Sequence, residues 1–496
     1  MRIRSAESIR MRPWSVTAPG PRPRPLWLQQ ALDRDPGTAA PTLDAVVSAD
    51  VCIVGGGFTG LWTAVRLLEA DPSLSVVVVE ADICGSGASG RNSGGVGHYW
   101  TKLGMLARVL GREDALRLIE SSVRAAPQVI ELCDRYGVDA QPRVGRSVWA
   151  ATTRSQVDSW ASILRTADAL GVRTPYRPLQ DEELREMYGP APYLAGVVQD
   201  GQTGVQPGYL VRGLRRVALD LGARIFEQSP VVSIDSMSDQ VAVLTERGQV
   251  NADQVVLGAN AWMAHLPDFR RHVMVLSSDC VATDPIPELV VERGLDRRPP
   301  GINSRLMVNY GGVSRDKRIY LGRAGGTVAR DARITPEFDR STRNARQMEA
   351  DFRYLYPQLP EVRLTTWWSG AVDRSVSGLP WFGRMRHDPR IHFGIGFTGH
   401  GVAATVTGGD ILASHVLGRD DEWADLGRLL ARVHESSSTF PPEPARYLGG
   451  RVVQGALYRK ETAERDGRRV RRVDAALARL APGTFVELRA GSGSTP

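Results

Sequence analysis

The feature that most constrains the fold is a glycine-rich turn between an apolar strand and an apolar helix. Gly55, Gly57 and Gly60 occupy the glycine positions of the pattern G-x-G-x-x-G, directly after the strand-like sequence DVCIV. Apolar residues at helical spacing predict a helix over 58–70, and the next strand-like run, VVVVE, ends on Glu80. This order of strand, glycine turn, helix and strand predicts one unit of a Rossmann-like α/β sheet.

The same turn has the chemistry of a dinucleotide-binding site. Its glycines permit a tight turn, let the backbone approach a pyrophosphate and let the helix pack on the strand, while the helix N-terminus supplies amides and a positive dipole. Glu80 can accept hydrogen bonds from both hydroxyls of an adenosine ribose. Its charge repels a 2′-phosphate, which disfavours NADP. FAD and NAD both remain candidates, because they share this half of the ligand.

Two further glycine-rich segments favour FAD. The loop over 85–97 offers many backbone amides, together with the guanidinium of Arg91 and the amide of Asn92, to a long ligand. Near the C-terminus, a strand over 391–395 is followed by glycines and a helix over 401–417. The N-terminus of that helix can stabilise the negative charge that a reduced flavin gathers at N1 and the C2 carbonyl. An NAD enzyme does not need this second site.

The residues expected to bind FAD come from these segments and from the ends of neighbouring strands. They are Gly55, Gly57, Phe58, Thr59, Gly60, Glu80, Ala81, Gly87, Ala88, Ser89, Arg91, Asn92, Ser93, Gly94, Val232, Ala259, Trp262, Gly370, Gly396, Thr398, Gly399, His400, Gly401 and Val402.

Composition and charge argue against several other classes of protein. No run approaches the roughly eighteen apolar residues of a membrane span, and the N-terminal sequence lacks the apolar core of a secretory signal, so we expect a cytoplasmic protein without an integral membrane segment. The net charge is +7, but only three of the 62 basic residues are lysine, which indicates a compositional bias more than a nucleic-acid surface. The four scattered cysteines predict reduced thiols, and the histidine spacing predicts no metal site.

The chain resembles the glycine oxidase and sarcosine oxidase, or D-amino acid oxidase-like, flavoproteins. The resemblance lies in GGGFTGLWTA, VVVVEAD, GASGRNSGG, VQPG, VVLGANAW and a late series of the form W-[SG]-G, D-x-x-x-G-L-P-x-x-G and G-F-x-G-x-G-V. It covers roughly residues 25–480. The order GFTGLWTA, ANAWM, VMVLSSDCVATDPIP, WWSGAVDRSVSGLPWFG and FPPEPARYLGG is most similar to the aminophosphonate oxidoreductases, with gamma-glutamylputrescine oxidase as a more distant relative.

The resemblance implies an α/β fold, in which a Rossmann-like FAD-binding domain of the glutathione reductase type carries an α+β substrate domain with an antiparallel sheet. The organisation expected is an N-terminal arm over 1–45, an FAD-binding domain over 46–140, 195–262 and 366–420, a substrate domain over 141–194 and 263–365, and a helical extension over 421–496 that ends in a disordered GSGSTP tail.

The activity that the resemblance implies is oxidation of the C–N bond of a small amine with an anionic group, an aminophosphonate or an amino acid. A hydride passes from the carbon that bears the amine to flavin N5, the imine hydrolyses, and oxygen takes the electrons. We expect non-covalent FAD, because Asn92 stands where some relatives carry a tethering histidine and no cysteine follows Cys280. Arg323 stands where such oxidases often place a lysine over the flavin, which leaves an electron carrier or quinone open as the acceptor.

Five residues are candidates for contact with the substrate or the flavin ring. Arg305 and Arg323 are expected to clamp a carboxylate or phosphonate, although either guanidinium would serve equally well in a structural ion pair. Tyr310 is expected to close over the anionic end of the substrate. His98 and His400 are expected to face the flavin.

Two alternatives to an oxidase stay open. The first is an FAD-dependent amine dehydrogenase that uses a carrier or quinone, and the second is a tRNA-modifying flavoprotein, although no RNA-binding module is apparent. The partners expected are therefore a small-molecule amine and oxygen, with no nucleic acid, and a monomer or dimer.

Overall fold

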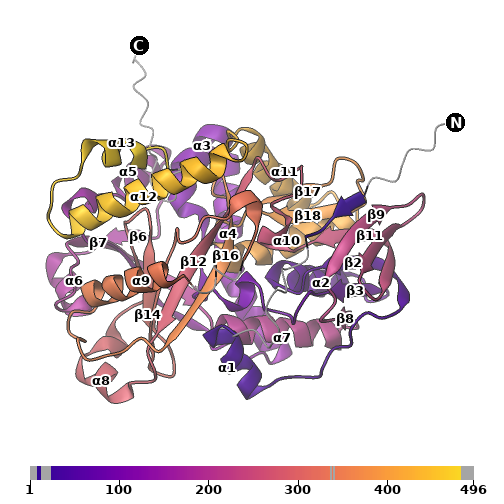
Figure 1. Cartoon of the computed structure of the whole chain (residues 1–496), viewed down its shortest axis with the longest axis horizontal. Helices are drawn as coiled ribbons and strands as arrows, with labels where there is room; N and C mark the ends of the chain where they lie inside the picture. Colours follow the sequence, from indigo (N-terminus) through magenta and orange to yellow (C-terminus); the bar gives the residue numbers. More distant parts are fainter. Residues whose placement is uncertain (1–7, 13–23, 336–337, 339–340, 482–496) are drawn as a thin grey trace, which may run out of the picture.

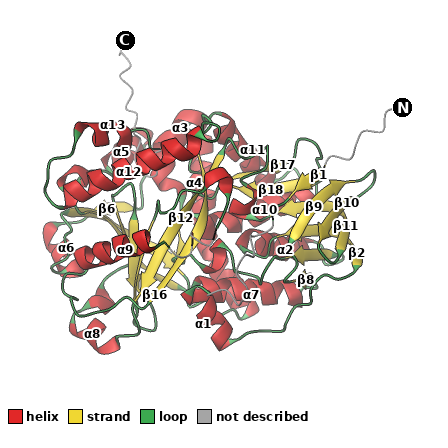
Figure 2. Cartoon of the chain, in the orientation of Figure 1, coloured by secondary structure: helices red, strands yellow, loops and turns green. Residues whose placement is uncertain are grey.

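The computed structural model describes residues 8–12, 24–335, 338 and 341–481. Two large sheets lie side by side, and helices pack around both (Figures 1 and 2). In the view of Figure 1, the sheet with the glycine turn lies to the right and the second sheet lies at the centre and left. The expected Rossmann-like sheet in a mixed α/β fold is thus confirmed.

The first sheet has the predicted strand–helix–strand unit at its centre. β2 (Val46–Val54) pairs in parallel with β3 (Val76–Val79) on one side and with β11 (Gln249–Leu257) on the other. The other strands of this sheet are β1 (Ser8–Arg10), β8 (Arg224–Phe226), β9 (Val231–Ser236), β10 (Val241–Thr245), β17 (Trp381–Arg384) and β18 (Ile391–Ile395). The parallel centre brings the C-terminal ends of β2, β3, β11 and β18 to one edge, where such sheets bind their ligands.

The alternation of side chains along the central strands explains how this sheet is covered. In β2, Val51 and Ile53 pack into a cluster with the helices, whereas Cys52 and Val54 pack into a second cluster on the opposite face. The helices on this half of the molecule are α1 (Leu26–Arg34), α2 (Phe58–Ala70), α3 (Leu103–Leu110), α4 (Arg112–Tyr136), α7 (Pro207–Asp220), α10 (Gly401–Val416) and α11 (Glu422–Glu435). Burial on both faces accounts for the continuous apolar runs that the sequence shows here.

The second sheet is almost wholly antiparallel. Its order is β16 (Thr366–Ser375), β12 (Val273–Ala282), β15 (Ile319–Arg323), β14 (Asn309–Val313), β13 (Gly301–Asn303), β5 (Arg143–Ala151), β7 (Ala195–Gly204) and β4 (Gly95–Val96), with β6 (Tyr176–Pro178) paired to β7. Around it lie α5 (Ala161–Leu170), α6 (Asp181–Tyr188), α8 (Pro287–Glu292), α9 (Thr342–Leu355), α12 (Ala445–Arg465) and α13 (Arg472–Ala478). This sheet is the antiparallel one expected for a substrate domain.

The structure corrects the expected domain boundaries at two strands. We assigned 195–262 and 366–420 to the FAD-binding domain, but β7 and β16 belong to the second sheet. β16 pairs with β12 along ten residues, from Val273 opposite Ser375 to Ala282 opposite Thr366. The local sequence of an apolar strand does not indicate which sheet it joins. Both strands were therefore expected in the sheet of their neighbours along the chain.

The two ends of the chain also pack against different parts of the fold. In the N-terminal arm, β1 pairs with β9, and α1 buries Trp27 and Leu28. The helices of the C-terminal extension pack on both halves of the molecule: α11 packs beside α10, whereas α12 lies over the second sheet (Figure 1). The GSGSTP tail lies outside the described residues. Within the described residues, no helix has the length and apolar character needed to cross a membrane.

Candidate functional site

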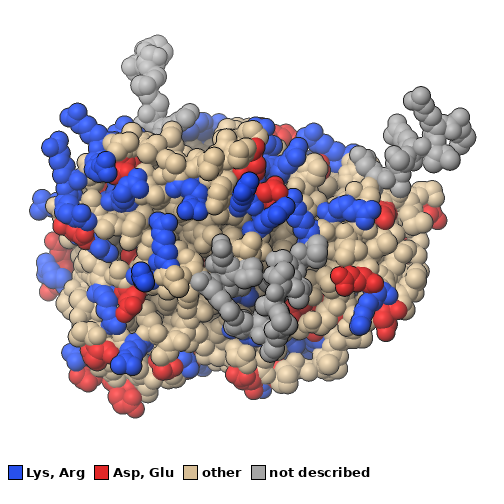
Figure 3. All heavy atoms as spheres, viewed as in Figure 1, with Lys and Arg blue, Asp and Glu red and all other residues tan. Residues whose placement is uncertain are grey.

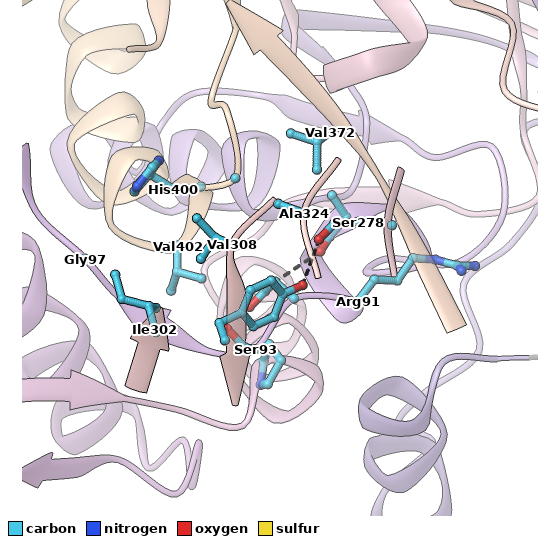
Figure 4. Close-up of a pocket in the computed structure, with 18 of the residues that line it drawn as sticks. Arg91, Ser93, Gly97, Ser278, Ile302, Val308, Ala324, Val372, His400 and Val402 are labelled. Carbon is cyan, nitrogen blue, oxygen red and sulfur yellow. Dashed lines mark hydrogen bonds between the residues drawn. The ribbon is translucent and has the colours of Figure 1, made fainter. Parts of the chain in front are cut away.

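A cavity of about 1800 Å³ lies between the two sheets. The turn after β2, the loop after β3 and the start of α10 line it from the first half of the molecule, and β12, β14 and β16 line it from the second. Among the residues labelled in Figure 4, Ser93 and Gly97 come from the glycine loop, Val402 and His400 from the start of α10, Ser278 and Val372 from β12 and β16, and Val308 from the segment just before β14. The volume exceeds the roughly 300–1,000 Å³ of ordinary small-ligand pockets, so an extended cofactor and a substrate both have room.

The turn between β2 and α2 leaves space for a phosphate only because it is built from glycine. Gly55 has a φ of +110°, and a Cβ on it would lie 3.0 Å from the carbonyl oxygen of Gly258. A Cβ on Gly60 would lie 2.0 Å from the oxygen of Gly55. Gly57 and Phe58 line the cavity at the helix start, so their amides and the helix dipole are placed to receive a pyrophosphate.

Glu80 lies at the end of β3 and lines the same part of the cavity. Its carboxylate accepts hydrogen bonds from the amides of Gly56 at 2.7 Å and Asp82 at 2.9 Å. Burial raises its pKa to about 7. A bound adenosine ribose would supply further hydrogen-bond donors to this acceptor, so the residue fits the role predicted from the sequence.

The glycine loop is tied to both halves of the molecule. Ser89 Oγ accepts a hydrogen bond from the Phe58 amide at 2.8 Å, which holds the loop against the start of α2. The Arg91 guanidinium donates to the carbonyl oxygens of Ser86 and Ser369, each at 2.8 Å, and thereby joins the loop to β16. Asn92 donates to the carbonyl of Ser89 at 2.8 Å. The side chains of this loop therefore shape the cavity as well as line it.

The start of α10 forms the second glycine-bracketed wall. The segment between β18 and α10 has positive φ at Gly396 (+84°), Thr398 (+54°) and Gly399 (+85°). Asp373 Oδ2 accepts a hydrogen bond from the Gly396 amide at 2.6 Å and fixes this turn, and burial raises the Asp373 pKa to about 7. Because Gly401 and the first turn of α10 line the cavity, a group that becomes negative there meets the positive end of the helix.

Positive charge next to α10 comes from Arg374, which lines the cavity, and from Lys102, which does not line it but acts through its charge on His400; neither is among the predicted catalytic residues. Burial lowers the pKa of Arg374 to about 10, and burial together with the charge of Arg374 lowers that of Lys102 to about 8. Burial and the charge of Lys102 lower the pKa of His400 to about 4, and burial lowers that of His98. At neutral pH, His400 is therefore neutral, while Arg374 and Lys102 carry the charge.

Tyr310 lies in the cavity lining. Its hydroxyl shares a hydrogen bond with Ser278 Oγ at 2.8 Å and contacts Cys280 Sγ at 3.3 Å. Burial raises its pKa well above the usual value, so the hydroxyl keeps its proton. Ile302 and Val308, labelled in Figure 4, line the apolar surroundings. This part of the cavity offers a polar contact inside a largely apolar enclosure.

The structure corrects the prediction for Arg305 and Arg323. Neither residue lines the cavity. Arg305 is buried and donates to Asp351 at 2.8 Å and to Glu461 at 3.0 Å. Arg323 donates to Gln347 at 2.9 Å and lies 3.7 Å from Asp351. These two guanidinium groups form a structural ion-pair cluster in place of the expected anion clamp.

Four predicted cofactor residues shape the cavity without lining it. Gly60, Gly94 and Gly396 are turn residues whose neighbours line it, and Val231 lines it where we expected Val232. Successive side chains of a strand point to opposite faces, so the side chain of Val232 points away from the face on which Val231 lies. The other predicted cofactor residues lie in the lining, as do His98, His400 and Tyr310.

Sequence reasoning missed lining residues from the two ends of the chain. Trp27 comes from α1, and Val453 and Leu457 come from α12. No motif marks these positions, because their side chains meet the cavity only through tertiary packing. The one available signal was the apolar periodicity of the C-terminal helix. This periodicity indicates that one face of the helix is buried, but it does not indicate which part of the protein covers that face.

Comparison with known proteins places this site in context. The family model described as DAO, FAD dependent oxidoreductase, matches residues 50–415. Gamma-glutamylputrescine oxidoreductase from Escherichia coli (strain K12) is 28% identical over 403 residues, which cover 78% of this chain and 88% of that protein. Glycine oxidase from Bacillus licheniformis is 22% identical over 391 residues, covering 76% and 95%. The crystal structure of glycine oxidase from Geobacillus kaustophilus aligns with a TM-score of 0.61 and 22% identity over 76% of this chain and 96% of that one, which shows a shared fold.

Proposed function

The chain belongs to the DAO family of FAD-dependent oxidoreductases, and on that premise we propose that it oxidises the C–N bond of a small amine that carries an anionic group. FAD is its cofactor, and it is an enzyme of the amine and amino acid oxidoreductase type. The relatives named above are a glycine oxidase and a gamma-glutamylputrescine oxidoreductase, which supports an amine as the substrate. An aminophosphonate or an amino acid has both the amine and the anionic group.

The residues present fit FAD along its whole length. Glu80 would bind the ribose, the start of α2 the pyrophosphate, and the glycine loop with the start of α10 the flavin ring. When bound, FAD accepts the two electrons that leave the substrate carbon as a hydride. We propose that the binding is non-covalent, because the Asn92 amide is not a nucleophile and hydrogen bonds to its own loop.

The charge of the cavity lining is the observation that supports an anionic group on the substrate. Seven basic side chains gather where β5 and β13 begin and where β14 turns into β15, against three acidic ones in the same part of the lining. They are Arg143, Arg146, Arg293, Arg297, Arg298, Arg315 and Lys317, against Glu186, Asp296 and Asp316. The face drawn in Figure 3 likewise carries Lys and Arg side chains along its upper part. Such a field attracts anions and orients a substrate with separated amine and anionic ends.

The protein groups near α10 favour the reactive form of the substrate. An amine assists the departure of hydride through its lone pair, so the neutral form reacts. The charges of Arg374 and Lys102 oppose a substrate ammonium in their vicinity and lower its pKa. Tyr310, held by Ser278, offers a hydrogen bond, while Ile302 and Val308 help to exclude water.

Anaerobic mixing with a panel of amines tests this proposal. The panel contains 2-aminoethylphosphonate, glycine, 4-aminobutanoate, gamma-glutamylputrescine and the neutral control propylamine. We expect at least one anionic amine to bleach the flavin absorbance at least about tenfold faster than propylamine, because charged hydrogen-bonding partners contribute about 1.5–3 kcal/mol each. Equal rates with propylamine, or no bleaching by any amine, would contradict the proposal. Rapid mixing of the reduced protein with oxygen then distinguishes oxygen from a carrier or quinone as the acceptor.

The lowered pKa of Lys102 predicts a pH dependence of anion binding. Protonated Lys102 attracts an anionic ligand and neutral Lys102 does not, so affinity for non-reactive propionate should fall roughly five- to tenfold between about pH 7 and about pH 9. The measurement is a titration followed by the flavin spectrum, with propionamide as the uncharged control. In Lys102→Arg, the decrease in propionate affinity should occur only above about pH 9, because a guanidinium keeps its proton. In Lys102→Met, the pH-dependent decrease should be absent. An unchanged profile in Lys102→Met would show that another group titrates.

A further inference from the structure

One end of the cavity is closed by a helix that lies beyond the part of the chain matched by the family model. That match ends at residue 415, whereas α12 spans Ala445–Arg465. Its residues Gly449, Gly450, Val453, Gln454 and Leu457 line the cavity together with residues of β12 and β14. In Figure 1, α12 runs along the top of the second sheet. The family fold alone therefore does not define this end of the site.

A single face of α12 is turned toward the cavity and the sheet. Arg446, Gly450, Val453, Leu457 and Glu461 follow one another at intervals of three or four residues, which places them on one side of a helix. Val452, the residue before Val453, lies about 100° around the helix from it, is 53% exposed and does not line the cavity. The helix thus presents two adjacent valines to two different environments.

Hydrogen bonds hold α12 in register along its length. Near its start, the Arg446 guanidinium donates to the carbonyl of Val273 at 3.2 Å, and in its middle Gln454 donates to the carbonyl of Gly325 at 2.8 Å. Near its end, Glu461 accepts from Arg305 at 3.0 Å and from the Met307 amide at 3.1 Å.

The last of these attachments also fixes the cavity wall opposite α12. Arg305 is buried and joins Glu461 of α12 to Asp351 of α9. The residues that follow it, Leu306 and Met307, line the cavity and pack with Leu457 and Val453. The buried ion pair therefore joins the helix to this segment.

Space beneath α12 is already limited. A Cβ on Gly450 would lie 3.3 Å from Met274 Cε and 3.6 Å from Val328 Cγ1, so the helix sits close over the start of β12. Val453, one turn further along, is half-buried at the cavity surface. A larger side chain at 453 would shorten the cavity at this end, and a smaller one would lengthen it.

We propose that α12 selects substrates by size, and that Val453 sets the longest ligand that the cavity accepts. This rests on the proposed function for the identity of the substrate, but the size limit applies to any anion that enters from the basic side of the cavity. It assigns a role in specificity to a segment outside the matched family region.

Three variants test the proposal: Val453→Phe, Val453→Ala and the matched control Val452→Phe. The probes are two non-reactive carboxylates of different length, acetate and hexanoate, whose dissociation constants are measured from the flavin spectrum of the holoenzyme. Val453→Phe should weaken hexanoate at least about tenfold and acetate less than about twofold, since a methylene that no longer fits costs about tenfold or more. Val453→Ala should tighten hexanoate relative to acetate, and Val452→Phe should leave both unchanged. Melting temperatures establish that each variant is folded.

Equal weakening of acetate and hexanoate by Val453→Phe, or equal effects of Val453→Phe and Val452→Phe, would overturn the size limit. If the carboxylates bind and the Val453 variants discriminate between acetate and hexanoate, but no amine reduces the flavin of the wild type, the proposed function is wrong and the size limit is supported. If amines reduce the wild type but the Val453 variants do not discriminate between acetate and hexanoate, the size limit is wrong and the proposed function is supported. Should neither carboxylates bind nor amines react, both proposals fail.

Discussion

Replacement of Gly60 by alanine is expected to weaken FAD binding at least about 100-fold. The added Cβ would lie 2.0 Å from the carbonyl oxygen of Gly55, in the turn after β2, and 3.0 Å from Cγ2 of Ile53, a fully buried residue of β2. Neither atom belongs to a flexible side-chain end, so β2 and α2 must move apart and the amides that receive the pyrophosphate lose their arrangement. We expect the dissociation constant for FAD to rise at least about 100-fold, which corresponds to about 2.8 kcal/mol. Flavin content after purification and fluorescence titration of the apoprotein measure it.

The matched control is Gly449→Ala in α12. There an added Cβ meets no heavy atom within 4 Å, and alanine is more favourable than glycine inside a helix by about 0.5–1 kcal/mol. This variant should keep its flavin and melt no lower than the wild type. Normal flavin content in Gly60→Ala would mean that the turn does not hold the pyrophosphate, and the reading of the whole nucleotide site would be wrong.

Replacement of Arg305 by methionine is expected to cost stability and to spare catalysis. Removing the guanidinium leaves Asp351 and Glu461, each only 3% exposed at the side chain, without their main partner. Breaking a buried ion pair in this way costs about 3–5 kcal/mol, a large part of the roughly 5–15 kcal/mol that stabilises a domain. Burial acts to raise the Asp351 pKa, but the charges of Arg305 and Arg323 hold it below its usual value. In the variant its pKa should rise, so the loss of stability should grow as pH increases from acid to neutral.

Chemical denaturation and the rate of flavin reduction separate the two roles that Arg305 could have. A structural residue lowers the free energy of unfolding and leaves the reduction rate of the folded protein almost unchanged. A substrate clamp would instead raise KM by about tenfold or more at nearly constant stability. Arg428→Met is the control, because Arg428 is 57% exposed and its ion pairs lie at the surface, where such pairs contribute little.

Local patterns were enough to predict the elements that form the candidate nucleotide half of the site. The glycines at 55, 57 and 60, the helix after them and Glu80 lie within one strand–helix–strand unit, and each is constrained by the backbone within a few residues. The second glycine-led helix, α10, is likewise recognisable from its own sequence. Steric limits on a turn and the period of a helix act over short distances, so a sequence displays them directly.

Tertiary structure alone decided the substrate half. The partners of Arg305 lie 46 and 156 residues away in the chain, and an arginine looks the same in sequence whether it clamps a ligand or closes an ion pair. The sheet in which β7 and β16 pair, and the end of the cavity that α12 closes, depend on the packing of the whole chain. The sequence by itself determined the glycine turns and the helices that follow them, because short-range sterics decide these. Only the folded chain determined which charges face the cavity, because long-range pairing decides which side chains are buried together.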